Sequence, residues 1–232
     1  MRVPLLVTEQ PTPDSWWAGR LDSFVDIWVP HFSSVWLDME GPKGSHDIAR
    51  RLKAGDEVWC YAALVQMPDE WEAAHGKPKV LKESNPPVWC LDFPAMNHRI
   101  TGWLMPRHGI TGLCYWATLA ASPGVDVWQD AGTFQHPGGD VYNGDGSFIY
   151  PATKKQHGRD MPVASIRLKW LREMADDYDY LMLARDGGME AAALEKAATF
   201  ARGFGDWNDD MTKLYAARRA IATMIAQKGG AQ

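Results

Sequence analysis

Four short apolar runs, rich in β-branched and aromatic residues, constrain the fold of this chain more than any other feature. They occupy residues 5–9, 25–30, 57–62 and 113–117. Hydrophobicity that is nearly continuous over about five residues is typical of a parallel strand covered on both faces. A further run at 88–92 is a weaker strand candidate, because prolines precede and follow it closely.

Helical patterns separate these runs. Residues 45–55 predict a helix with Ser45 as its N-cap and Gly55 at its C-terminus. Residues 94–108 predict a second helix, which ends at Gly109. Strands that alternate with helices imply βαβ crossovers, and such crossovers build a parallel sheet.

The last part of the chain predicts helices and no strands. Residues 121–162 have the composition of a long loop, rich in Gly, Pro, Asp and Asn, and such loops often form lids or binding edges. A helix then begins near Ser165, and two more are predicted at 189–202 and 206–227. The apolar stripe of the first of these helices comprises Ile166, Trp170, Leu171, Met174, Tyr178 and Leu181.

Together these elements predict an α/β fold with about four parallel strands. Four strand–helix units make up about half of a (β/α)8 TIM-type barrel, which typically needs about 250 residues. We therefore expect residues 1–164 to form the C-terminal half of such a barrel, with a long loop after its last strand. Residues 165–232 are expected to form trailing helices packed on the barrel.

Composition excludes several classes of function. The net charge is −5 and basic residues are scattered, whereas a nucleic-acid surface needs a clustered basic face. No apolar run approaches the ~20 residues that cross a bilayer. The N-terminus carries no export signal, so the chain as written is expected in the cytoplasm, and its location stays open if the N-terminus is truncated. Cysteine and histidine spacing predicts buried thiols at Cys60, Cys90 and Cys114, no metal site and no cofactor.

A series of short motifs follows in order between residues 3 and 225. The motifs are Val7-Thr8-Glu9-Gln10, Val25–Pro30, Gly55–Tyr61, Leu91-Asp92-Phe93-Pro94, Arg99, Gly112–Trp116, Gly144-Asp145-Gly146, Tyr150-Pro151, Ser165-Ile166-Arg167 and Asp177–Leu181. In this order they resemble the C-terminal half of the catalytic domain of glycoside hydrolase family 123. The resemblance implies a TIM-type barrel and an exo-N-acetyl-β-galactosaminidase activity. It also implies substrate-assisted retention, in which the 2-acetamido oxygen attacks the anomeric carbon.

That mechanism needs an aspartate to orient the acetamide and an adjacent glutamate as general acid/base. In the family the pair lies at the end of the fourth strand, and this chain begins just after that position. Asp56-Glu57 enters a strand at the opposite end, and Asp69-Glu70 follows a proline in a polar stretch. Asp38 and Glu40 fall in a predicted connection. The catalytic residues are therefore unassigned, and we expect this chain alone to be inactive, as a fragment or a degenerate copy.

Candidate binding residues lie where the predicted strands end, because barrel sites are built at the C-terminal ends of strands. The chain has twelve tryptophans, which serve as core bulk or as flat platforms for sugar rings. Trp116 is the candidate stacking floor, with packing in the barrel core as the alternative. Tyr61 is a candidate donor to an acetamide oxygen, or a core residue. The other candidates are Glu9, Trp28, His31, Asp92 and Tyr115, of which Trp28 also fits packing against helices and Asp92 also fits a helix cap.

Three hypotheses remain open. The chain is a family 123-like glycoside hydrolase fragment that binds an amino-sugar glycoside, or a non-catalytic carbohydrate-binding or scaffold protein. Alternatively, it is a half-barrel that is completed by a second copy or by a separate N-terminal half, since open sheet edges tend to pair.

Overall fold

The parallel sheet of the prediction is present. A computed structural model describes residues 3–8, 11, 23–41, 46–62, 87–120, 124–135, 141–158 and 160–230. Its four-stranded sheet is parallel throughout and has the order β1 (Leu6–Val7), β2 (Ile27–Trp28), β3 (Glu57–Ala62), β4 (Gly112–Tyr115). Each predicted apolar run contributes one strand. The weaker run at 88–92 forms bends and turns instead, so that strand prediction was wrong.

One face of the sheet is much more buried than the other. Side chains alternate across a strand, and Val58, Cys60 and Ala62 of β3 are buried in a core shared with the helices. Trp59 and Tyr61 point to the opposite face and are only half-buried. Sequence reasoning expected both faces to be covered equally, whereas burial along β3 alternates.

Helices follow β2 and β3 as a βαβ pattern requires. They are α2 (Phe32–Met39), α3 (Asp47–Ala54), α5 (Ala95–Leu104) and the 3₁₀ helix η1 (Met105–His108). The predicted ends at Gly55 and Gly109 are confirmed, since both glycines adopt positive φ. Ser45 lies outside the described residues, and the first turn of α3 is capped by Asp38, which accepts from the backbone N–H groups of Asp47 (2.9 Å) and Ile48 (3.0 Å).

Sequence reasoning missed α2, because residues 35–40 were interpreted as a connection. The helix begins directly after His31 without any side-chain cap, so the usual start signal is missing. Glu40, just past the end of α2, accepts a hydrogen bond from the backbone N–H of Phe204 (2.9 Å) and contacts His108 (2.7 Å). Asp38 and Glu40 therefore join elements of the fold, and neither lies in an open connection.

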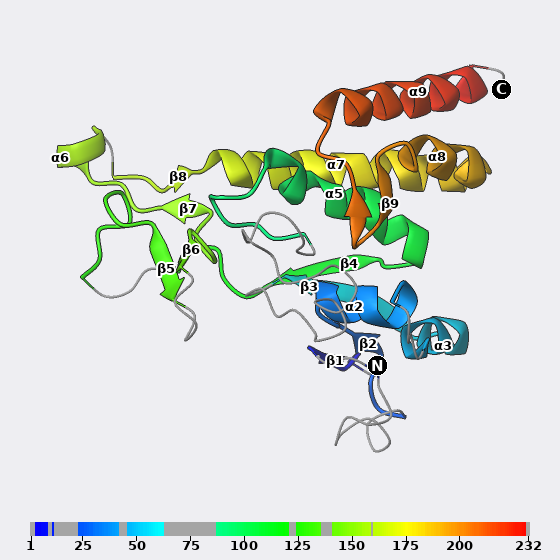
Figure 1. Cartoon of the computed structure of the whole chain (residues 1–232), viewed down its shortest axis with the longest axis horizontal. Coiled ribbons are helices and arrows are strands. Elements are labelled where there is room, and N and C mark those ends of the chain that lie inside the picture. Colours follow the sequence, from blue (N-terminus) through cyan, green and yellow to red (C-terminus); the bar gives the residue numbers. More distant parts are fainter. Residues whose placement is uncertain are drawn as a thin grey trace.

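The C-terminal region is a helical layer with a small hairpin inserted in it (Figure 1). Its helices are α7 (Ile166–Asp186), α8 (Glu190–Ala197) and α9 (Met211–Gly229). Strands β9 (Ala201–Gly203) and β10 (Asp206–Trp207) pair antiparallel, so the prediction of a strand-free C-terminal region was wrong. Met174 and Leu181 of the predicted α7 stripe are buried, but Ile166 is 60% exposed because it begins the helix.

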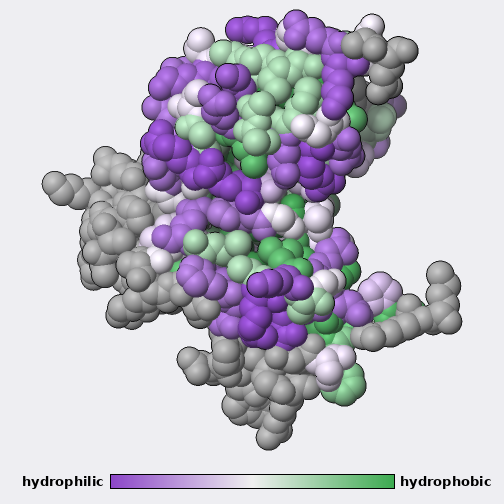
Figure 2. Space-filling view, turned by 90° about the vertical axis from the view of Figure 1, so that its right-hand side faces the viewer, coloured by the Kyte–Doolittle hydropathy of each residue, from purple (hydrophilic) through white to green (hydrophobic). Residues whose placement is uncertain are grey.

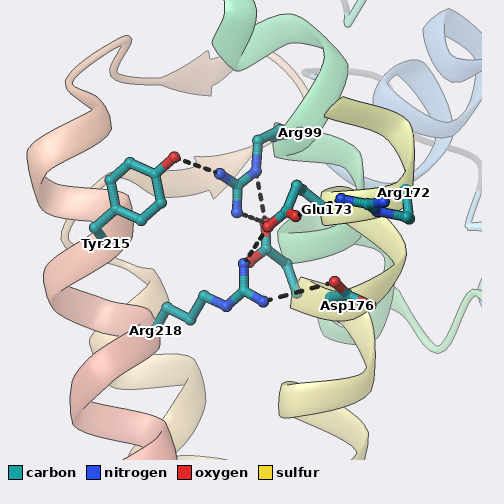
Figure 3. A network of polar contacts seen from close by, with 7 residues as sticks. Arg99, Arg172, Glu173, Asp176, Tyr215 and Arg218 are labelled. Atoms are coloured by element: carbon teal, nitrogen blue, oxygen red, sulfur yellow. Dashed lines mark hydrogen bonds and ion pairs between the residues drawn. The ribbon is translucent and has the colours of Figure 1, made fainter. Parts of the chain in front are cut away.

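A buried ion pair fixes this layer (Figure 3). Arg99 of α5 donates to Oδ2 of Asp177 of α7 from Nε (3.0 Å) and Nη2 (2.6 Å), and from Nη1 to the hydroxyl of Tyr215 of α9 (3.1 Å). Arg218 of α9 donates to Glu173 (2.9 Å) and lies 3.4 Å from Oδ1 of Asp177. The pair of Arg99 and Asp177 is thus an inter-element contact in the core, with both side chains at most 1% exposed.

The segment after β4 is more regular than predicted. Strands β5 (Gly132–Gln135) and β6 (Val141–Asn143) form one antiparallel pair, and β7 (Ile149–Tyr150) and β8 (Val163–Ala164) form another. A short helix, α6 (Lys154–His157), lies between β7 and β8. These elements lie together at the left of Figure 1, beyond the end of β4. The strands are too short to give a periodic sequence pattern.

The surface is mixed in character. Figure 2 shows weakly hydrophobic side chains bordered by hydrophilic ones over the helical layer. Among the described residues, no helix is both long and apolar enough to cross a membrane. The three cysteines are free, with Cys60 and Cys90 buried and Cys114 half-buried.

Candidate functional site

Four of the predicted site residues lie where neighbouring strands of the parallel sheet end, at its C-terminal edge. Tyr61 is in register with Cys114 and Tyr115 with Ala62, so the side chains of Tyr61 and Tyr115 point to opposite faces of the sheet. His31 follows β2, Tyr61 lies near the end of β3, and Tyr115 and Trp116 end β4. His31 forms a parallel bridge with Tyr61, and their rings meet edge to face with centroids 5.9 Å apart. The parallel register thus aligns the ends of neighbouring strands, as a site at this edge requires.

The turn at residues 143–146 packs against the end of β4 through Tyr115. Tyr115 donates from its hydroxyl to Oδ1 of Asp145 (2.8 Å) and accepts from the backbone N–H of Gly146 (2.7 Å). The Tyr115 ring packs on Trp89 and Phe148, with centroid distances of 5.1 and 4.9 Å. Asp145 is only 1% exposed, so the turn is built into the protein rather than projecting from it.

Trp116 lies against this turn and remains accessible. Its side chain is 45% exposed. Gly146 adopts a φ of +72°, and a Cβ atom placed on it would overlap the Trp116 indole ring. Glycine is therefore needed at residue 146 both for its backbone conformation and for the close approach of the ring. The result is an exposed indole held against a rigid turn.

Burial sets the protonation of the site. It is the main cause that raises the pKa of Asp145, while Tyr115, Trp116, Arg167 and the Gly146 N–H lower it. The pKa of Tyr61 is raised by burial and by Cys114 and Asp145, so its phenol stays protonated and can donate a hydrogen bond.

His31 is neutral in this setting. Burial lowers its pKa to about 4. Nδ1 lies 3.2 Å from the Ser33 hydroxyl, and the buried Nε2 has no hydrogen-bond partner among the described residues. A neutral imidazole next to Tyr61 can offer one donor or one acceptor to a ligand.

Asp92 is tied to the same turn. Its Oδ2 accepts from Nδ2 of Asn143 (2.8 Å), and the backbone N–H of Leu91 donates to the Asn143 carbonyl (2.8 Å). Helix α5 has Pro94 at its N-cap position and no side-chain cap, so Asp92 does not cap it. The exposed carboxylate of Asp92 therefore lies at the rim of the turn.

One predicted residue, Trp28, is not at this edge, and another, Glu9, is not among the described residues. Trp28 is 1% exposed, donates from its indole N–H to Asp56 (3.1 Å), and carries the Arg51 guanidinium over its ring. Asp56 precedes β3, so the Trp28 indole contacts the opposite end of the sheet and serves packing. Glu9 and the neighbouring Gln10 lie outside the described residues.

Of the carboxylate pairs considered from the sequence, those among the described residues do not supply a catalytic pair at this edge. Glu57, next to Asp56, accepts from the Trp59 indole (2.8 Å) and the Thr111 hydroxyl (2.7 Å), and these bonds lower its pKa. Asp69 and Glu70 lie outside the described part of the chain. Within the described ranges, no group of three or more His, Cys, Asp or Glu side chains is arranged to hold a metal ion.

Sequence reasoning missed the role of Asp145 and misassigned Arg167. The flanking glycines at 144 and 146 marked the turn, but they did not reveal that its carboxylate meets the hydroxyl of Tyr115. From residue type and spacing, Arg167, like Arg99 and Arg172, is expected to form a helix-surface or inter-element ion pair with Asp176 or Asp177. It is instead 1% exposed and donates to the backbone carbonyl groups of Trp89, Gly144 and Ser147.

Comparison with known proteins gives a likeness of fold. No protein-family model matches the sequence, and no curated protein matches it. The structure is similar to that of a family 123 glycoside hydrolase from Clostridium perfringens, described in connection with glycolipid glycan hydrolysis, with a TM-score of 0.51 and 13% sequence identity. The match covers 90% of this chain and 33% of that chain, so this chain spans about a third of the solved protein.

Proposed function

We propose that this chain is part of a glycoside hydrolase resembling family 123, and that the C-terminal edge of its sheet binds an amino-sugar glycoside. In this proposal the four strands belong to the C-terminal half of a TIM-type barrel. The likeness of fold to the clostridial enzyme supports it. That likeness concerns the fold, so the choice of ligand depends on the geometry of the site.

The observation that carries the proposal is the exposed Trp116 held on Gly146, next to the buried Asp145–Tyr115 contact. An indole face offers an apolar platform for the C–H face of a sugar ring, and a rigid platform binds at low entropic cost. Tyr61 supplies a protonated hydroxyl that suits an acetamide oxygen. His31 adds a neutral ring nitrogen, and Asp92 an exposed acceptor for sugar hydroxyl groups.

Hydrolysis needs more than the described residues of this edge supply. Substrate-assisted retention requires a carboxylate that orients the acetamide and an adjacent acid that protonates the leaving group. Within the described residues, the carboxylates at this edge are Asp145, which Tyr115 engages, and Asp92, which Asn143 engages. We therefore propose that this chain binds the sugar and that the acid–base pair comes from outside it.

Binding is tested by titrating the chain with an N-acetyl-β-galactosaminide and measuring heat release. The Trp116→Ala variant should lose about tenfold or more in affinity, the scale of one aromatic stacking contact. Trp128→Ala is the matched control, because Trp128 is also exposed (40%) but donates its indole N–H to Pro151 in the segment after β4. Equal losses in the two variants, or no binding by the wild type, would contradict the proposed site.

Catalysis is tested separately with an aryl N-acetyl-β-galactosaminide. We expect no release of the aryl group by this chain alone. If the wild-type chain releases the aryl group and Asp145→Asn does not, the proposal that the acid–base pair lies outside this chain is wrong. Asp145 would then belong to the catalytic residues.

A second candidate is a half-barrel completed by a partner, either a second copy or a separate N-terminal half. The exposure of Leu5 (44%) and Leu6 (37%) at edge strand β1 favours it, because an open apolar edge tends to pair. Sedimentation that shows a stable monomer over a wide concentration range would reject pairing with a second copy.

A further inference from the structure

We propose that Arg167 is a positioning residue for the candidate site: its guanidinium holds the 143–147 turn in the conformation that presents Trp116 and Asp145. As far as sugar binding is concerned, this inference rests on the proposed function. The position of the turn itself can be measured without any ligand.

The start of α7 places Arg167 beneath the turn. The backbone N–H of Ser165 donates to the Phe148 carbonyl (2.9 Å), and the Ser165 hydroxyl caps the helix by accepting from the N–H of Leu168 (3.2 Å). The guanidinium of Arg167 then lies over the Phe148 ring, 5.1 Å from its centroid. Both the backbone and the side chain of this helical turn are thus fixed by residue 148.

The guanidinium joins three segments. Nη1 donates to the carbonyl groups of Trp89 (2.8 Å) and Gly144 (2.7 Å), and Nη2 donates to the Ser147 carbonyl and the Tyr150 hydroxyl (3.1 Å). Only a planar group with several donors can serve these oxygens at once, and lysine cannot reproduce the arrangement.

The electrostatic setting is unfavourable for a purely structural cation. Arg167 is 1% exposed and lies in the first turn of α7, where the positive end of the helix dipole disfavours a positive charge. No salt bridge to Arg167 is formed within the described part of the chain. A buried charge that is not paired with a carboxylate is costly. The guanidinium contacts the 143–147 turn. Its charge lowers the pKa of Asp145, whereas burial raises it.

The two turn carbonyls bound by Arg167 flank the functional residues. Gly144 and Ser147 lie on either side of Asp145, which accepts from Tyr115, and Gly146, which supports Trp116. Gly144 has a φ of +70°, and a Cβ atom on it would lie 2.7 Å from Nη2 of Arg167. A side chain at residue 144 would therefore displace either the guanidinium or the turn.

The test uses the full chain labelled with 5-fluorotryptophan and observed by ¹⁹F NMR, with the Trp116 resonance assigned by Trp116→Phe. In Arg167→Lys we expect this resonance to shift or broaden. The affinity for an N-acetyl-β-galactosaminide should fall about tenfold, the scale of losing one aromatic stacking contact. The matched control is Arg99→Lys, which alters an equally buried arginine in the helical layer. It should lower the melting temperature and leave the Trp116 resonance in place.

Gly144→Ala tests the same contact from the turn side, also in case Arg167→Lys does not fold. It should change the Trp116 resonance as Arg167→Lys does. Gly158→Ala is its control, because Gly158 has a similar φ (+73°) with nothing within 4 Å of the added Cβ. In Arg167→Ala, added guanidinium ion should restore the wild-type resonance.

An unchanged Trp116 resonance in folded Arg167→Lys, or in Gly144→Ala, would overturn the positioning role even if the wild type binds sugar. If the wild type binds no amino sugar but the resonance responds as expected, the proposed function fails and the positioning role stands.

Discussion

Arg99 and Arg167 are both 1% exposed, and they lie on neighbouring helices, yet their guanidinium groups have different kinds of partner. Arg99 meets the carboxylate of Asp177, with Tyr215 and Arg218 around it (Figure 3). Arg167 meets the carbonyl groups of three loop residues and a tyrosine hydroxyl. An ion pair holds helices together, and apolar residues can replace it. Backbone carbonyl groups cannot be removed by substitution. If Arg167 is lost, these buried acceptors are left without a donor, which costs free energy.

The largest expected effect is on the Arg99 side of this comparison. Asp177→Asn leaves the Arg99 guanidinium buried without a carboxylate, and we expect a loss of about 3–5 kcal/mol in unfolding free energy. Urea denaturation followed by circular dichroism measures it. Glu173→Gln, on the solvent-facing arm of the same network, should cost less than about 1 kcal/mol.

The double variant Arg99→Met/Asp177→Leu sharpens that result. Removing both charges should recover most of the loss, because apolar residues often replace a buried ion pair at little cost. A double variant as unstable as Asp177→Asn would show that the two arginine networks are equally irreplaceable, and the comparison would fail.

The next effect is at the turn. Gly146→Ala combines positive-φ strain with overlap against Trp116, and we expect a cost of about 3 kcal/mol. Gly158→Ala carries only the strain, about 1 kcal/mol, because its added Cβ meets nothing. Equal unfolding free energies for the two variants would mean that the Trp116 ring yields easily and is not a rigid platform.

A smaller effect concerns the start of α7. Ser165→Ala removes the cap on Leu168 and should cost about 1 kcal/mol. Hydrogen exchange should accelerate at residues 144–147 near Arg167 and stay unchanged around Asp177, further along the same helix. If exchange accelerates equally at residues 144–147 and around Asp177, the contacts of Arg167 and those of Arg99 do not behave as independent networks.

The smallest effect is a pH dependence. Burial raises the pKa of folded Asp145 above its ordinary value of 3.8, so the folded state binds the proton more tightly than the unfolded state does. The stabilisation is then fully present below pH 3.8 and is lost as the pH rises through the raised value. Asp177 titrates in the same direction, also because of burial. The unfolding free energy of the wild type should therefore fall relative to Asp145→Asn over this window, and a rising difference would contradict the assignment.

Continuous apolar runs were sufficient to predict the parallel sheet, because a buried central strand is marked by its local composition. The predicted bounds of β3 are confirmed. Helix α2 was missed because His31 gives no cap signal. Strands β5 to β8 were missed because each has only two to four residues, too few to show a period of two. Four of the candidate site residues lie at the ends of neighbouring strands, as the sequence predicted. Residue type alone could not show that the partners of Arg167 are carbonyl oxygens. The complete barrel and the sugar ligand stay predictions.

The hydrogen bond from Phe204 to Glu40 has a consequence for folding during synthesis. It joins residues 164 positions apart, and the bond from Arg99 to Tyr215 spans 116 positions. Contacts of such long range form late, since loop closure must precede them. The end of α2, although translated early, therefore lacks its partner until the ribosome has released nearly the whole chain. A nascent chain stalled before residue 204 would leave Glu40 without its bond from the Phe204 N–H and Phe32 without its stacking partner Phe204, and incompletely packed apolar surface of this kind promotes aggregation.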